Sequence, residues 1–144
     1  MARYPLEAAR TVRATVRERA ERVVAEATRA QASATAAAVA AAEALRQFRS
    51  EQGGRTTGAP TTTTGAALHR ERAFRDRIDQ EEQTLVQALK TAASEERRRA
   101  LNTREAKRAL IEANVQEKVV DRHHERWSEN EKRVAERAEE REFE

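Results

Sequence analysis

Three histidines and several carboxylate pairs are the residues in this 144-residue chain that could do chemistry. Neighbouring histidines cannot both face one site on a helix, and helical metal sites need ligands three or four residues apart, such as Asp121 with His124. The carboxylate pairs, Glu81 with Glu82 and Glu139 with Glu140, stand in polar surroundings without an apolar cleft to shift their pKa. We therefore expect no catalytic residue, no metal site and no cofactor. The histidines are His69, His123 and His124.

The glycines and the densest basic run do not indicate a phosphate site. Gly53, Gly54 and Gly58 lack the Lys-Ser/Thr pair of a phosphate-binding loop. Residues 97–99 are three arginines, but glutamates stand at neighbouring turns of the same expected helix, so we predict a solvated, paired face. With 28 basic against 25 acidic residues and 3% aromatics, a one-sided nucleic-acid surface is not expected.

Composition points to long helices instead of a globular core. Charged residues make up 37% of the chain, Gly and Pro together number six, and Ala dominates the apolar share. No apolar run approaches 18 residues, so no membrane span is expected. The N-terminal stretch lacks the apolar core of a secretory signal. The absence of Cys excludes disulfides and favours a reducing, cytoplasmic compartment.

Glycine and proline divide the chain into two expected helices. Pro5 is tolerated in a first helical turn, and no Gly or Pro follows until Gly53. Residues 52–65 hold every glycine and the second proline, and residues 66–144 hold neither. We predict an all-α fold: one domain, 1–144, in which helices of about 5–51 and about 66–142 form an antiparallel coiled-coil hairpin closed by a Gly/Thr-rich loop, with the second helix longer.

Apolar spacing supports both helices. The first carries a stripe with steps of three and four residues: Ala9, Val12, Val16, Ala20, Val23, Ala27, Ala30, Ala34, Ala37, Ala41, Ala44 and Phe48. The second carries a seven-residue ladder: Ile78, Leu85, Ala92, Arg99, Ala106, Ala113, Val120, Trp127 and Val134. A companion column four residues later mixes Leu89, Leu110 and Ala138 with polar residues, which is typical of a weak coiled coil.

Pairing the helices around the loop centre predicts the register. Residue i then lies near residue 117 − i, so Leu6 lies near Ile111, and about the last thirty residues overhang with Trp127 among them. In so Ala-rich a chain, the few aromatic side chains are expected to be anchors. We expect Phe48, Leu68 and Phe74 to gather at the hairpin tip, where packing against one another and exposed docking are both open.

The N-terminal segment resembles the start of a known family. Tyr4-Pro5-Leu6-Glu7, followed by Val12-Arg13 and an Ala-rich helix, resembles the FliJ/YscO (SctO) stalk proteins of bacterial type III secretion, and the charged segment from Glu95 to Glu142 resembles their second helix. Chain size and the two-helix plan agree with that family. The Thr/Gly loop and the short first helix depart from the more equal hairpin of its members.

The resemblance implies a non-enzymatic central stalk that is cytoplasmic and peripheral to the secretion apparatus at the inner membrane. Such a stalk binds the hexameric export ATPase, couples it to the export gate protein, and handles secretion chaperones in some members. The ATPase side would comprise Tyr4, Leu6, Arg13, Trp127 and Val134, and the hairpin tip with Phe48, Leu68 and Phe74 would face the gate. Flagellar and injectisome systems both stay open.

Two alternatives come from other classes of protein. One is a self-associating coiled-coil scaffold or chaperone-like adaptor, for which the unpaired overhang argues. The other, which the interleaved acids disfavour, is a nucleic-acid-binding helical protein.

Overall fold

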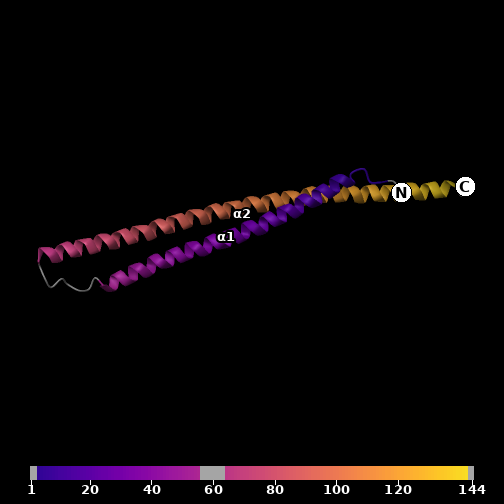
Figure 1. The fold of residues 1–144 in the computed structure, drawn as a ribbon. Helices are drawn as coiled ribbons and strands as arrows, with labels where there is room; N and C mark the ends of the chain where they lie inside the picture. The colour runs from indigo at the N-terminus through magenta and orange to yellow at the C-terminus, as the bar shows by residue number, and fades with distance from the viewer. Residues whose placement is uncertain (1–2, 56–63, 143–144) are drawn as a thin grey trace. The chain divides into compact units, whose positions relative to one another are not determined.

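Two long helices make up the part of the chain that the structure describes. The computed structural model describes residues 3–55 and 64–142. Helix α1 runs Glu7–Arg55 and helix α2 runs Gly65–Glu142, with no strand in these ranges (Figure 1). The predicted all-α helical hairpin with a longer second helix is confirmed.

The start of α1 lies slightly later than predicted. Pro5 precedes the helix, and the carbonyls of Tyr4 and Leu6 accept hydrogen bonds from the backbone N–H groups of Glu7 (3.3 Å) and Arg10 (3.0 Å). Glu7 places a carboxylate at the positive end of the helix dipole. The Tyr4-Pro5-Leu6 segment therefore forms a turn that leads into the helix and is not part of it.

The predicted loop of residues 52–65 is too long at both ends. Residues 52–55 belong to α1 despite Gly53 and Gly54, and Arg55 in the last turn meets the negative end of the helix dipole. At the other end Thr64 precedes α2 in the cap position, and its carbonyl accepts hydrogen bonds from Ala67 (2.9 Å) and Leu68 (3.0 Å). Residues 56–63 of the predicted loop lie outside the described residues.

Contacts divide the chain into two compact units, where one domain was predicted. Unit 1 comprises residues 1–28 and 102–144, and unit 2 comprises residues 29–101. In unit 2, α1 and α2 pack through a seam of small residues in which Ala34, Ala38 and Leu45 are buried. Arg49 of α1 forms an ion pair with Glu82 of α2, Nε to Oε1 at 2.7 Å.

Unit 1 brings the first half of α1 against the second half of α2. Its buried residues are Tyr4, Thr103, Ala106 and Ala113. The Thr103 hydroxyl donates a hydrogen bond to the carbonyl of Ala27 at 3.2 Å. Two ion pairs join the helices, Arg10 with Asp121 (3.0 Å) and Arg17 with Glu117 (2.7 Å). Polar contacts and small apolar residues therefore share this interface.

The predicted register is wrong in both units. In the ion pairs Arg10–Asp121 and Arg49–Glu82 the paired residue numbers add to 131 instead of 117, a difference of 14 residues, or two heptads. Leu6 therefore does not lie near Ile111. Tyr4 contacts Trp127, so Trp127 is not part of an unpaired overhang.

The predicted α2 seam is confirmed over most of its length. Every ladder position from Ile78 to Trp127, Arg99 included, is buried or half-buried, and so is the companion column from Glu82 to Glu131. Val134, the last ladder position, is exposed. The α2 ladder therefore faces α1 up to the level of Tyr4.

The apolar stripe predicted for α1 is confirmed in part. Its column Ala20, Ala27, Ala34, Ala41 and Phe48 lies at the interface. The other interface column was not predicted: Arg10, Arg17, Val24, Gln31, Ala38, Leu45 and Gln52. Val12, Val16 and Val23, which were expected to face inward, are exposed.

Candidate functional site

An aromatic cluster in unit 1 ties the N-terminal segment to α2. The Tyr4 ring lies 5.3 Å from the Trp127 ring and meets the His124 ring edge-on at 4.7 Å, both measured between ring centroids. Its side chain is 5% exposed, the lowest exposure among the aromatic residues of the described chain. The spacing of His124 and Trp127, one helical turn apart, presents both rings to the same partner. Tyr4 and Trp127, both predicted for one binding end, are therefore in direct contact.

The Tyr4 hydroxyl adds a polar contact to this cluster. Its oxygen lies 2.8 Å from Nδ1 of His123. A neutral imidazole whose Nδ1 is unprotonated accepts this bond from the hydroxyl, and a protonated ring donates to the hydroxyl oxygen. Which of the two groups donates this hydrogen bond therefore depends on the tautomer of the His123 ring. His123, which is exposed, and His124, which is half-buried, both contact the Tyr4 ring.

Arg17 of α1 continues the polar interface beyond the aromatic cluster, in the direction of the loop. Arg17 donates a hydrogen bond to Glu21 on its own helix (2.6 Å) and pairs with Glu117 across the interface. The pKa of the Arg17 guanidinium is raised above its ordinary value, chiefly by the hydrogen bond to Glu21 and next by the charge of Glu117. Arg17 therefore stays charged, and its guanidinium binds Glu21 on its own helix and Glu117 on α2.

We expect the Arg17–Glu117 pair to show coupling on charge reversal. Arg17→Glu places a carboxylate against Glu117 and Glu21, and Glu117→Arg leaves two guanidiniums facing each other, so each single variant lowers the thermal unfolding midpoint. The loss is modest in each case, because the pair is partly exposed to solvent. The double variant recovers part of the loss, measured by circular dichroism. Equal, additive losses would contradict the contact.

The remaining residues predicted for the ATPase side lie on the surface of unit 1. Leu6, Arg13 and Val134 are all exposed. Leu6 and Arg13 flank the first turns of α1, and Val134 lies seven residues beyond Trp127 on α2. This end therefore combines a buried anchor, Tyr4, with apolar and cationic side chains that are accessible to a partner.

The three residues predicted at the hairpin tip do not gather. Phe48 is half-buried and lines an open hollow of unit 2 with Leu85 and other residues of the first three turns after Asp76. Leu68 and Phe74 are exposed on the first turns of α2. Because Arg49 pairs with Glu82, the end of α1 comes level with about Asp76, so the preceding turns of α2 have no α1 segment beside them in the described chain.

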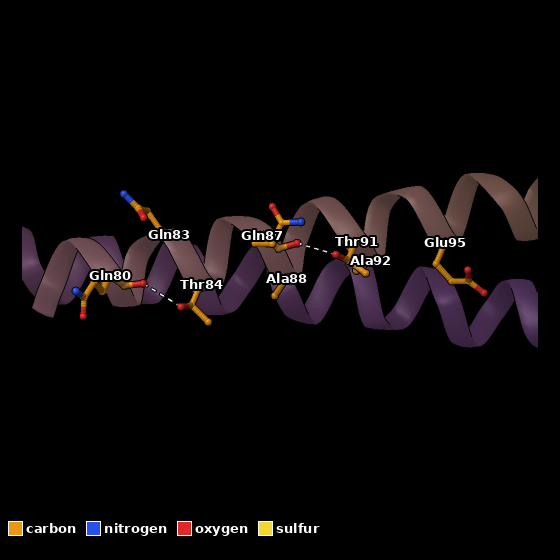
Figure 2. Close-up of a pocket in the computed structure, with 8 residues that line it drawn as sticks. All are labelled: Gln80, Gln83, Thr84, Gln87, Ala88, Thr91, Ala92 and Glu95. Carbon is orange, nitrogen blue, oxygen red and sulfur yellow. Dashed lines mark hydrogen bonds between the residues drawn. The ribbon is translucent and has the colours of Figure 1, made fainter.

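An open groove runs along one side of α2 in unit 2, and Figure 2 shows the eight residues that line it: Gln80, Gln83, Thr84, Gln87, Ala88, Thr91, Ala92 and Glu95. The hydroxyls of Thr84 and Thr91 donate to carbonyls one turn back, those of Gln80 (2.9 Å) and Gln87 (3.0 Å). Both hydroxyls are therefore satisfied within the helix. The groove therefore offers side-chain amides, methyl groups and the Glu95 carboxylate.

Glu95, at the end of this groove, accounts for part of the basic run. Its pKa is lowered below the ordinary value, first by the hydrogen bond from Arg98 and then by that from Arg99. The two bonds measure 2.8 and 2.7 Å. The predicted pairing of residues 97–99 with glutamates of neighbouring turns is supported for these two arginines, of which Arg98 is exposed and Arg99 is half-buried.

Two further features of the described chain concern metals and membranes. Within residues 3–55 and 64–142, no three His, Asp or Glu side chains gather as a metal ion would require. In the same ranges, neither helix has an apolar stretch that could cross a membrane.

The chain was compared with protein-family models, characterised proteins and solved structures. No protein-family model, no characterised protein and no solved structure matches the chain.

Proposed function

We propose that this chain is a stalk component of a bacterial type III secretion apparatus. In this role it binds the hexameric export ATPase through the end that carries Tyr4, and links the ATPase to the export gate protein and to secretion chaperones. It acts without catalysis, in the cytoplasm, at the inner-membrane base of the apparatus.

One observation carries most of this proposal. The residues that the family resemblance assigns to the ATPase side come from both ends of the chain, and Tyr4 and Trp127 meet in unit 1 at 5.3 Å between ring centroids. Around this anchor Leu6, Arg13 and Val134 remain exposed. The Tyr4–Trp127 contact holds the two segments together, and the exposed apolar and cationic side chains around it are the ones that a partner can reach.

The mixed charge of the helix surface also suits a stalk. Partly exposed ion pairs of the kind seen between Arg49 and Glu82 contribute little individually and are screened by salt. A helix pair with such a surface can contact successive subunits of a ring without binding any one of them tightly.

The test is direct binding to the cognate export ATPase. We expect the purified chain to bind the hexamer and to stimulate its ATP hydrolysis. The double variant Arg13→Glu with Val134→Asp should reduce affinity by about tenfold or more, because both residues are exposed and their loss leaves the fold intact. The matched control, Leu68→Asp with Phe74→Asp, changes equally exposed residues of unit 2 and should leave ATPase binding unchanged while weakening binding to the gate protein.

Three results would count against a stalk. If the purified chain neither binds the ATPase nor stimulates its ATP hydrolysis, the stalk role is excluded. A stable dimer or tetramer at micromolar concentration, seen by sedimentation and without ATPase binding, would favour the self-associating scaffold. Binding to DNA or RNA that falls steeply with salt would favour a nucleic-acid-binding protein.

A further inference from the structure

Three large apolar side chains line the outside of α2 in unit 1. Ile111, Val115 and Val119 are 63%, 56% and 62% exposed. They are spaced four residues apart, so they form one row of about 12 Å along the helix. We call this row the outer ridge.

The outer ridge faces away from α1. Ala113, which is 6% exposed, marks the side of α2 that packs on α1. Val115 follows two residues later, which at about 100° per residue places it about 200° around the helix. Ile111 and Val119 lie on either side of that direction. The hairpin itself therefore cannot cover the ridge.

Local structure does not explain these residue types. β-Branched side chains lose rotamer freedom in a helix and are less favourable there than the Ala that fills much of this chain. A single exposed Val or Ile needs no explanation, but a row of three on one face marks an interaction site. Packing against α1 therefore does not account for the ridge.

The charge around the ridge indicates the partner's chemistry. Two acids of this segment, Glu117 and Asp121, are half-buried and paired with Arg17 and Arg10 of α1. The exposed side chains of residues 102–126 consequently include six bases against three acids. The six bases are Arg104, Lys107, Arg108, Lys118, Arg122 and Arg126.

We propose that the outer ridge docks an amphipathic helix of another protein that has acidic flanks. Apolar anchors spaced four residues apart fit the groove of a second helix. Acidic flanks on that helix would face Arg108, Lys118 and Arg122, which steer encounter and fix the direction of docking. A second copy of this chain is a poor occupant, because it would bring a ridge with the same positive excess against this one.

The docking can be measured on the full chain. The chain has no Cys, so Gln116→Cys, at an exposed position beside the ridge, carries a single environment-sensitive dye. Two synthetic helical peptides share one Leu pattern, and their flanks are Glu in one and Lys in the other. We expect the Glu-flanked peptide to bind at least about tenfold more tightly, with an affinity that falls as salt rises.

Two sets of variants distinguish binding at the outer ridge from non-specific binding of the peptides. Val115→Asp should weaken binding of the Glu-flanked peptide by about tenfold or more. The matched control is Val12→Asp, because Val12 is 59% exposed on α1 of the same unit, and it should have no effect. The triple change Arg108→Glu, Lys118→Glu and Arg122→Glu should reverse the preference between the two peptides. Circular dichroism checks that each variant stays helical.

Other outcomes would overturn the docking proposal. Equal binding of both peptides, or equal loss in the Val115 and Val12 variants, would remove the specific ridge. A dimer in sedimentation that Val115→Asp abolishes would make a second copy the occupant. Binding to vesicles of phosphatidylglycerol and phosphatidylcholine that Val115→Asp abolishes, with no peptide binding, would make the surface a membrane contact.

Discussion

Replacing Tyr4 by alanine is expected to release the N-terminal segment and to destabilise unit 1 by about 2–3 kcal/mol. Tyr4 is 5% exposed and contacts three aromatic or imidazole rings of α2, so its removal leaves a gap that the short Tyr4-Pro5-Leu6 segment can only partly fill. Amide exchange should rise in the first turns of α1 and near Trp127. The Trp127 fluorescence should shift to the red as its ring becomes hydrated.

Two controls identify the origin of this effect. Tyr4→Phe keeps the ring and removes only the hydroxyl that contacts His123, and should cost about 1 kcal/mol. Leu6→Ala changes a neighbour that is exposed and should alter stability by less than about 0.5 kcal/mol. Unchanged exchange near Trp127 in Tyr4→Ala would show that the ring contacts do not hold this segment.

Leu45→Ala is expected to have the largest effect in unit 2, a loss of roughly 2–3 kcal/mol in the free energy of unfolding. Leu45 is 6% exposed, and the other residues buried in this seam, Ala34 and Ala38, are small. Its removal therefore takes away the main large side chain that packs inside unit 2. Urea unfolding followed by circular dichroism, with amide exchange to locate the loss in residues 29–101, measures it.

Val39→Ala is the matched control for Leu45. Val39 lies on the same helix and in the same unit but is 52% exposed, so its truncation should change stability by less than about 0.5 kcal/mol. Leu45→Met keeps the volume and should cost less than about 1.5 kcal/mol. A Leu45→Ala variant as stable as Val39→Ala would mean that the α1–α2 seam of unit 2 does not pack as described.

The helices and the α2 seam could be predicted because their signals are local. The spacing of Ile78, Leu85 and Trp127 repeats every seven residues, and long stretches without Gly or Pro are rich in the helix formers Ala, Arg and Glu. Helix ends were predicted less well. Gly53 and Gly54 suggested a loop, but a helix of 49 residues extends through two unfavourable positions before it ends at Arg55.

The register could not be predicted from the apolar pattern, because that pattern is degenerate. A shift of whole heptads brings the same columns into contact, and the error was two heptads. Charged residues remove the degeneracy. In the expected register Arg10 would meet Lys107, whereas in the structure it meets Asp121. Similarly, Arg49 would meet Leu68 instead of Glu82. The information was in the sequence, but in the charged residues at the edges of the seam and not in its apolar pattern.

The missed interface arginines have the same cause. Arg10 and Arg17 were not included in the apolar stripe because they are charged, although they continue the seven-residue spacing of Val24, Ala38 and Leu45. Their long stems can lie along apolar surface while the guanidiniums reach acids at the edge. A search for acids at matching positions on α2 would have found Glu117 and Asp121.

The large sequence separation between residues in contact in unit 1 also affects the order in which contacts form during synthesis. Arg49 and Glu82 are 33 residues apart, whereas Tyr4 and His123 are separated by 119 residues. Closing the shorter span costs less chain entropy, so the pairing is expected to close from unit 2 toward the chain ends. A ribosome adding 5–20 residues per second needs roughly 6–24 s between Tyr4 and His123. During that interval Tyr4 lacks the rings that later cover it, and its side chain is open to chaperones of the nascent chain.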